Sequence, residues 1–154
     1  MEGEQAIKKS GCLYIIIRTA WLYSGYGHNF VKTISRLASE RDELNVVNDQ
    51  WGTPTYAGDL AEAIISIMER DDLPELEGVY HFTNEGACTW YDFAKEIVAF
   101  TGANCKVNPV TTEEYPSKVK RPAYSILDKT KIKETFDLEI RDWREALKSC
   151  MATF

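Results

Sequence analysis

The sequence Leu44-Asn45-Val46-Val47-Asn48-Asp49-Gln50-Trp51-Gly52-Thr53-Pro54-Thr55 joins an apolar strand pattern to a polar loop interrupted by Gly and Pro. An apolar helix pattern follows from near Tyr56. In open α/β sheets the carboxyl ends of the strands form the ligand-binding crevice, so the Asp, Gln and Thr side chains of this loop are placed to bind a ligand. The stretch therefore predicts a strand, a binding loop and a helix in an α/β fold.

Strand and helix patterns alternate along the rest of the chain, which also indicates α/β with parallel pairing of the earlier strands. Strands are expected at 13–17, 44–48, 79–83 and 106–110. Helices are expected before a stop at Gly11, from an Asn29 cap through Ala38, from a Thr55 cap through Met68, from a Thr89–Asp92 capping box to Gly102, from an Asp128 cap through Glu134, and from an Asp142 cap through Met151. The apolar positions of the third helix are Leu60, Ala61, Ile64, Ile65 and Met68. A loop is expected from 111 to 122.

Composition narrows the class of protein. The chain has 154 residues, 44% of them hydrophobic and 27% charged, which is typical of one soluble domain. Its net charge of −6 leaves no basic stripe for nucleic acid, so we expect no nucleic-acid partner. No signal peptide is recognised, and no apolar run reaches the roughly 20 residues of a membrane span, so we expect a cytoplasmic protein without a membrane contact.

The four cysteines are widely and irregularly spaced, and only two histidines accompany them. This spacing argues against a zinc site. A chain of this length can bury a sizeable core without disulfide bonds, so we expect reduced thiols.

Several side chains are candidates for ligand contacts, and each has a structural alternative. Trp21 follows a buried strand, where a flat ring can pack on a sugar or base, but it could equally be a core residue. Asn29, Asp49 and Gln50 could bind hydroxyl groups or could serve as caps and turn formers. Arg121 could make a bidentate contact with a diphosphate, although a mobile basic loop around Lys118 and Lys120 is the simpler interpretation of charge alone.

Taken in order, these segments resemble those of the dTDP-4-dehydrorhamnose reductases, a family of extended short-chain dehydrogenase/reductases. The matching segments are Gly3-Glu4-Gln5, Ile17-Arg18-Thr19-Ala20-Trp21-Leu22-Tyr23, Asn29-Phe30, Asp49-Gln50-Trp51-Gly52-Thr53-Pro54-Thr55, Tyr80-His81-Phe82, Trp90-Tyr91-Asp92-Phe93-Ala94, Lys120-Arg121-Pro122-Ala123-Tyr124-Ser125 and Trp143-Arg144-Glu145-Ala146-Leu147. The resemblance covers essentially the whole chain but only the C-terminal half of the family's proteins.

The resemblance implies the fold and activity of the parent protein. The fold would be the C-terminal part of a Rossmann-like enzyme, with residues up to about 70 completing the parallel sheet and about 71–154 forming a small substrate-binding α/β subdomain. The parent would reduce dTDP-4-dehydro-L-rhamnose to dTDP-L-rhamnose with NADPH or NADH. A Mg ion is compatible with this family but is not assigned to any residue.

The catalytic groups implied by the family lie in its N-terminal half, which carries a Gly-rich pyrophosphate loop and a Tyr-x-x-x-Lys pair. In that scheme the Lys lowers the pKa of the Tyr, which protonates the C4 carbonyl oxygen as hydride arrives. Neither motif occurs in this sequence, and Met1-Glu2-Gly3-Glu4 resembles the residues directly after the family's Lys. We therefore expect a chain that starts one residue past that motif, needs the missing N-terminal Rossmann half as a partner and is inactive alone.

The family also implies binding roles for individual positions. Trp21 matches a tryptophan that contacts the substrate, and Thr19 and Ala20 match a segment near the nicotinamide of the cofactor. The positions in segments that line the nucleotide-sugar side are Asn29, Gln50, Gly52, Pro54 and Arg121. No residue of this chain is assigned as catalytic.

Two other functions stay open from the sequence. The chain could be a non-catalytic subunit that binds a nucleotide sugar or regulates an enzyme, or it could belong to another epimerase or reductase of the same superfamily.

Half of a doubly wound sheet would leave the strand at 13–17 with an unpaired edge and apolar faces, so we also expect a homo-oligomer.

Overall fold

The computed structural model describes residues 2–115, 119 and 121–153. Its elements in chain order are α1 (Glu2–Lys9), β1 (Ile15–Arg18), β2 (Leu22–Tyr23), α2 (Phe30–Glu40), β3 (Glu43–Val47), β4 (Trp51–Gly52), β5 (Thr55–Tyr56), α3 (Ala57–Met68), the 3₁₀ helix η1 (Leu73–Leu76), β6 (Gly78–His81), β7 (Cys88–Thr89), α4 (Trp90–Thr101), β8 (Lys106–Val110), α5 (Thr130–Phe136) and α6 (Trp143–Met151). The expected loop residues Pro116, Lys118 and Lys120 lie outside the described residues.

The strands pair two by two. β1 runs parallel to β6, with Ile15 opposite Gly78 and Arg18 opposite His81. β3 runs parallel to β8 over five residue pairs, from Glu43 to Val47. The short strands add a parallel pair, β2 with β5, and an antiparallel pair, β4 with β7. The predicted α/β class and parallel pairing are confirmed.

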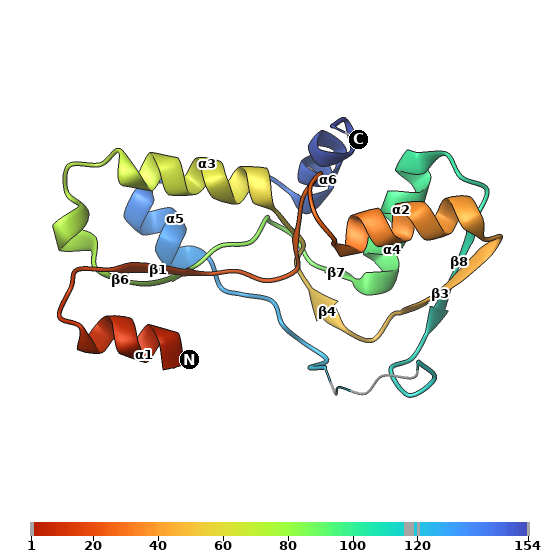
Figure 1. The fold of residues 1–154 in the computed structure, drawn as a ribbon, viewed down its shortest axis with the longest axis horizontal. Coiled ribbons are helices and arrows are strands. Elements are labelled where there is room, and N and C mark those ends of the chain that lie inside the picture. Colours follow the sequence, from red (N-terminus) through yellow and green to blue (C-terminus); the bar gives the residue numbers. More distant parts are fainter. Residues whose placement is uncertain (1, 116–118, 120, 154) are drawn as a thin grey trace.

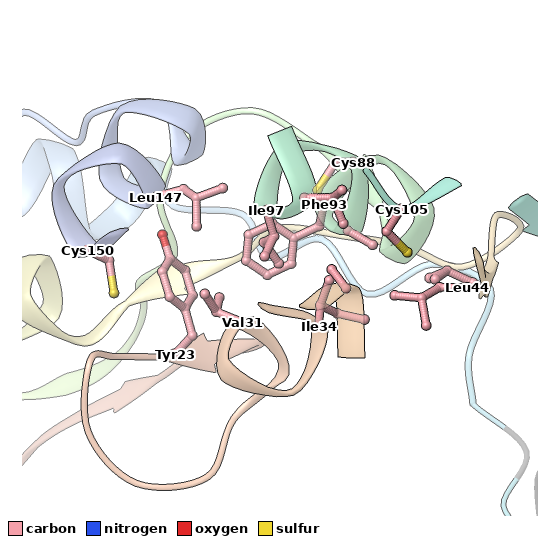
Figure 2. Close-up of a cluster of buried hydrophobic side chains, with 14 of the residues drawn as sticks. Tyr23, Val31, Ile34, Leu44, Cys88, Phe93, Ile97, Cys105, Leu147 and Cys150 are labelled. Atoms are coloured by element: carbon pink, nitrogen blue, oxygen red, sulfur yellow. The ribbon is translucent and has the colours of Figure 1, made fainter. Parts of the chain in front are cut away.

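Two groups of elements are visible in Figure 1, and each has its own core. Helices α3 and α5 pack against β1 and β6 at one end, around Ile67, Tyr80 and Ile132. At the other end α2, α4 and α6 enclose the larger core that Figure 2 shows, with Val31, Phe93, Ile97, Leu147 and Cys150 among its buried residues. Both cores take residues from before and after residue 70.

Local capping chemistry confirms several predicted helix ends. The side chain of Asn29 accepts a hydrogen bond from the backbone N–H of Lys32 at the start of α2. Thr89 and Asp92 form the predicted capping box of α4, and Gly102 ends that helix in the left-handed conformation. The Asp142 side chain caps α6 through the backbone N–H of Arg144.

Two other caps differ from prediction by one residue. Helix α3 has Tyr56 as its N-cap, without a side-chain hydrogen bond. The Thr55 hydroxyl, predicted to cap this helix, donates instead to the carbonyl oxygen of Ala20 at 2.6 Å, because β5 lies beside β2. The N-cap of α5 is Lys129, and Asp128 precedes it while accepting a hydrogen bond from the backbone N–H of Thr130.

Most of the apolar positions expected in α3 are exposed. The helix buries Ala63 and Ile67, whereas Ala61, Ile64, Ile65 and Met68 are exposed. The sequence of α3 is apolar around more of its circumference than one core can cover, so periodicity alone could not tell which face is buried. Of the exposed residues, Ile64 and Met68 form an apolar surface beside β1 together with Leu13, Ile15 and Ile17.

Candidate functional site

Three aromatic side chains meet beyond the carboxyl end of β1. The rings of Trp21 and Trp90 are stacked, with centroids 3.5 Å apart and planes 11° from parallel. Phe30 lies against Trp90 at a centroid distance of 4.6 Å. Trp90 and Phe30 are the first residues of α4 and α2, so the capped starts of two helices fix two of the three rings.

The backbone of Trp21 has a φ of 49°, in the left-handed region that non-glycine residues rarely adopt. This conformation costs about 1–2 kcal/mol for an L-residue. Gly52 lies against the same indole. A methyl group added at Gly52 would be only 2.8 Å from Nε1 of Trp21.

A cavity of about 330 Å³ opens beside this stack. It is lined by Ala20, Trp21, Gln50, Trp90, Arg121, Pro122 and Ser125. A second cavity, of about 520 Å³ between α2 and β3, shares Gln50, Trp90 and Arg121 with the first. The guanidinium of Arg121 lies 6.0 Å from the centre of the Trp90 ring. A cation and an aromatic ring therefore stand at the boundary of both cavities.

Backbone pairing holds the Arg121 segment next to the cavity. The N–H of Trp51 donates to the carbonyl oxygen of Ala123 at 2.8 Å, and the N–H of Ser125 donates to the carbonyl oxygen of Trp51 at 2.9 Å. These bonds align the segment around Tyr124 parallel to β4. The predicted binding loop after β3 thus also positions the segment that follows Arg121.

A polar network supports Gln50. Its Nε2 donates to the Thr112 hydroxyl at 3.0 Å, and that hydroxyl donates to Oδ1 of Asp49 at 2.6 Å. The backbone N–H of Thr112 also donates to Oδ2 of Asp49 at 2.9 Å. The side-chain and backbone hydrogen bonds from Thr112 lower the pKa of Asp49. Asp49 therefore connects the loop after β3 to the loop after β8 as a carboxylate.

The structure brings together five of the eight predicted binding residues. Ala20, Trp21, Gln50 and Arg121 line one cavity, and Gly52 contacts Trp21.

The other three predicted residues do not line these two cavities. Asn29 uses its amide as a helix cap, and its Nδ2 donates to the carbonyl oxygen of Ser24 at 2.8 Å. The Thr19 hydroxyl donates to that of Thr55 at 3.2 Å, and Pro54 is buried between β4 and β5.

Sequence reasoning did not assign Trp90, Phe30 or Thr112 to the site. Trp90 and Phe30 each follow a predicted helix cap directly, and this shared position at a helix start is the signal that could have found them. Thr112 has no comparable signal, because its role depends on the pairing of β3 with β8.

The described residues include no group of three or more His, Cys, Asp or Glu side chains that could hold a metal ion. Among the helices in the described part, none has the length and apolar character needed to cross a membrane. All four cysteines are free, and only Cys12 is exposed.

Parallel strands linked by helices, with a polar and aromatic cavity beyond the strand ends, define an α/β protein with a candidate ligand site. The family model described as the RmlD substrate binding domain matches residues 1–154, and the chain belongs to this family, that of the dTDP-4-dehydrorhamnose reductases. The family resemblance of the sequence is thereby confirmed.

Individual relatives agree with this assignment. The chain is 45% identical to a dTDP-4-dehydrorhamnose reductase from Aggregatibacter actinomycetemcomitans, over 98% of the chain and 54% of that protein. It is similar to the structure of a dTDP-4-dehydrorhamnose reductase from Bacillus anthracis in complex with NADP, with a TM-score of 0.91 and 40% identity over 99% of the chain and 53% of the other.

A structure of an orthologous reductase from Clostridium acetobutylicum gives a TM-score of 0.88 and 46% identity over 99% of the chain and 52% of the other. The chain therefore spans about half the length of the relatives it matches.

Proposed function

We propose that this chain is the substrate-binding part of an NADPH-dependent reductase that converts dTDP-4-dehydro-L-rhamnose to dTDP-L-rhamnose. The observation that carries the proposal is the cavity beside the Trp21–Trp90 stack, in which Gln50 and Arg121 also take part. Family membership over the whole chain supports the same function.

Each cavity residue has a chemical role in this proposal. The guanidinium of Arg121 is exposed and planar, which suits it to the oxygens of a diphosphate. The amide of Gln50 donates from Nε2 to the Thr112 hydroxyl, and its Oε1 can accept a hydrogen bond from a ligand hydroxyl. One face of the Trp21 ring is covered by Trp90, so Trp21 meets a ligand with the rest of its indole.

The cofactor would depend mainly on residues outside this sequence. Thr19 and Ala20 follow the carboxyl end of β1, the place where α/β sheets bind ligands, and this position fits contact with a nicotinamide. NADPH would supply hydride, whereas the Gly-rich loop and the Tyr-x-x-x-Lys pair of the family are absent from the sequence. We therefore expect no NADPH oxidation above the blank when this polypeptide is mixed with the keto sugar.

The test is a calorimetric titration of the chain with dTDP-rhamnose, repeated with Trp21→Ala and with Tyr26→Ala as the control. Tyr26 is highly exposed and lines neither cavity. Saturable binding that is lost in Trp21→Ala and kept in Tyr26→Ala supports the proposal. Tighter binding of UDP- or GDP-sugars would instead assign the site to a different nucleotide-sugar enzyme.

A further inference from the structure

We propose that Trp90 is a positioning residue that holds Trp21 in the geometry needed for ligand binding. This inference rests on the proposed function for the identity of the ligand, and on the structure for the relation between the two rings. In this proposal the side chain of Trp90 affects ligand binding by holding the indole of Trp21 in place.

The backbone of Trp21 supplies the first argument. At a φ of 49° an L-residue is strained, and relaxation to negative φ would redirect the Cα–Cβ bond and carry the indole away from the cavity. Strained conformations persist only where surrounding contacts fix them, and they are frequent in ligand sites. Trp21 therefore needs a partner that favours its present orientation.

The stack identifies that partner. The centroids of Trp21 and Trp90 are 3.5 Å apart and the rings are nearly parallel, so their faces overlap almost fully. Gly52 also lies against the indole of Trp21 and leaves room for it because it has no side chain. Movement of the Trp21 ring would break the overlap with Trp90.

Trp90 itself is firmly fixed. It is the first residue of α4, directly after the Thr89 capping box. Phe30 packs on it, and Phe30 in turn stacks on the fully buried Phe93 with centroids 5.6 Å apart. A row of aromatic rings thus connects the strained Trp21 to the larger core that Figure 2 shows around Phe93.

The experiment uses the 154-residue chain labelled with ¹⁵N, because its four tryptophans give four indole N–H resonances. Trp21→Phe identifies the Trp21 signal by its disappearance. Trp90→Leu removes the flat ring, Trp90→Phe keeps a smaller one, and Phe100→Leu is the control for loss of an exposed aromatic ring on the same helix. Binding of dTDP-rhamnose is measured for each variant.

We expect Trp90→Leu to shift and broaden the Trp21 indole signal and to raise the dissociation constant of dTDP-rhamnose about tenfold. Trp90→Phe should restore most of the binding, and Phe100→Leu should change neither signal nor binding. The double variant Trp21→Leu with Trp90→Leu should bind no more weakly than Trp21→Leu alone, because leucine at position 21 has no ring for Trp90 to hold.

Other results would overturn the proposal. An unchanged Trp21 signal in Trp90→Leu would exclude positioning whatever the ligand does. A further tenfold loss in the double variant would show that Trp90 contacts the ligand directly. If Trp90→Leu does not fold, Trp90→Phe and Trp90→Tyr provide the same comparison with smaller changes. If wild type does not bind dTDP-rhamnose while the Trp21 signal still moves, the proposed function fails and the positioning of Trp21 stands.

Discussion

The guanidinium of Arg141 binds the carboxylate of Asp59, 82 residues earlier in the chain, with Nε donating to Oδ2 at 2.9 Å. Nδ2 of the fully buried Asn84 donates to the same oxygen, and Oδ1 of Asn84 accepts from the backbone N–H of Tyr56 at 2.8 Å. One carboxylate therefore joins the start of α3, the segment after β6 and the segment before α6.

We expect Arg141→Met to lower the free energy of unfolding by about 2–4 kcal/mol, because it leaves a carboxylate that is 10% exposed without its cation. Denaturant unfolding measures the change. Arg36→Met is the matched control, because Arg36 pairs with Glu40 on the exposed surface of α2 and such pairs contribute little. Equal losses in the two variants would contradict a special role for the Asp59 pair.

A second prediction concerns Gly52. A methyl group there would lie 2.8 Å from Nε1 of Trp21, closer than van der Waals contact allows, and the ring is confined by its stack with Trp90. We expect Gly52→Ala to destabilise the chain by about 1–3 kcal/mol and to weaken binding of dTDP-rhamnose.

Gly3→Ala is the control for Gly52→Ala. Gly3 lies in α1, and a methyl group added there would meet nothing within 4 Å, so alanine should stabilise that helix slightly. Thermal unfolding distinguishes the two changes by their opposite signs. A Gly52→Ala chain with wild-type stability and affinity would show that the Trp21 ring can move freely.

Local and distant interactions explain what the sequence could predict. The caps at Asn29 and Thr89 were correct because their partners lie three residues away. The buried face of α3 could not be predicted, because the choice between apolar faces depends on which elements pack against the helix. The Trp21–Trp90 stack could not be predicted from pattern, since it needs the end of β1 and the start of α4 to be placed together in space.

We expect Glu85 to make the free energy of unfolding depend on pH. Partial burial raises the pKa of its carboxyl, but the hydrogen bond from Lys133 and the charges of Lys129 and Lys133 hold that pKa below its ordinary value of 4.5. A lowered folded-state pKa stabilises the fold above pH 4.5, and this contribution is lost as the pH falls through the folded-state pKa.

We therefore expect Glu85→Gln to reduce the free energy of unfolding by about 1–2 kcal/mol at pH 7, partly because Lys129 is buried, with a side chain 9% exposed, and would lose its carboxylate. The difference from wild type should shrink as the pH falls below 4.5. Urea unfolding across this pH range measures it, with the exposed Glu75→Gln as control. A difference in the free energy of unfolding between wild type and Glu85→Gln that grows as the pH falls would contradict a lowered folded-state pKa for Glu85.

We expect one cysteine, Cys12, to react much faster than the other three. Cys12 is exposed, whereas burial raises the pKa of the Cys88 thiol to about 12 and that of Cys150 to about 11, and Cys105 is also buried. Because the thiolate is the reactive form, we expect one fast equivalent with a disulfide reagent in the native chain and four after unfolding. Cys12→Ser should remove the fast phase; a fast phase that survives would place a second thiol at the surface.

The apolar surface beside β1 leads to a prediction about assembly. Leu13 is 64% exposed and Met68 69% exposed, and both line a cavity of about 570 Å³ between β1 and α3. In the described part of the chain β1 pairs with β6 alone, so its other edge can accept a further strand. We propose that two or more copies of the chain associate through this surface.

Light scattering should give a mass that rises with concentration. Met68→Lys should shift the mass towards that of the monomer, because burying the lysine charge in the contact has a large desolvation penalty. Tyr26→Lys changes an exposed aromatic residue on the other group of elements and should leave the mass unchanged. A wild-type monomer at every concentration would contradict self-association. The same substitution can be made in a longer protein that includes the family's N-terminal half. If Met68→Lys leaves the mass of that protein unchanged, the N-terminal half covers the surface instead.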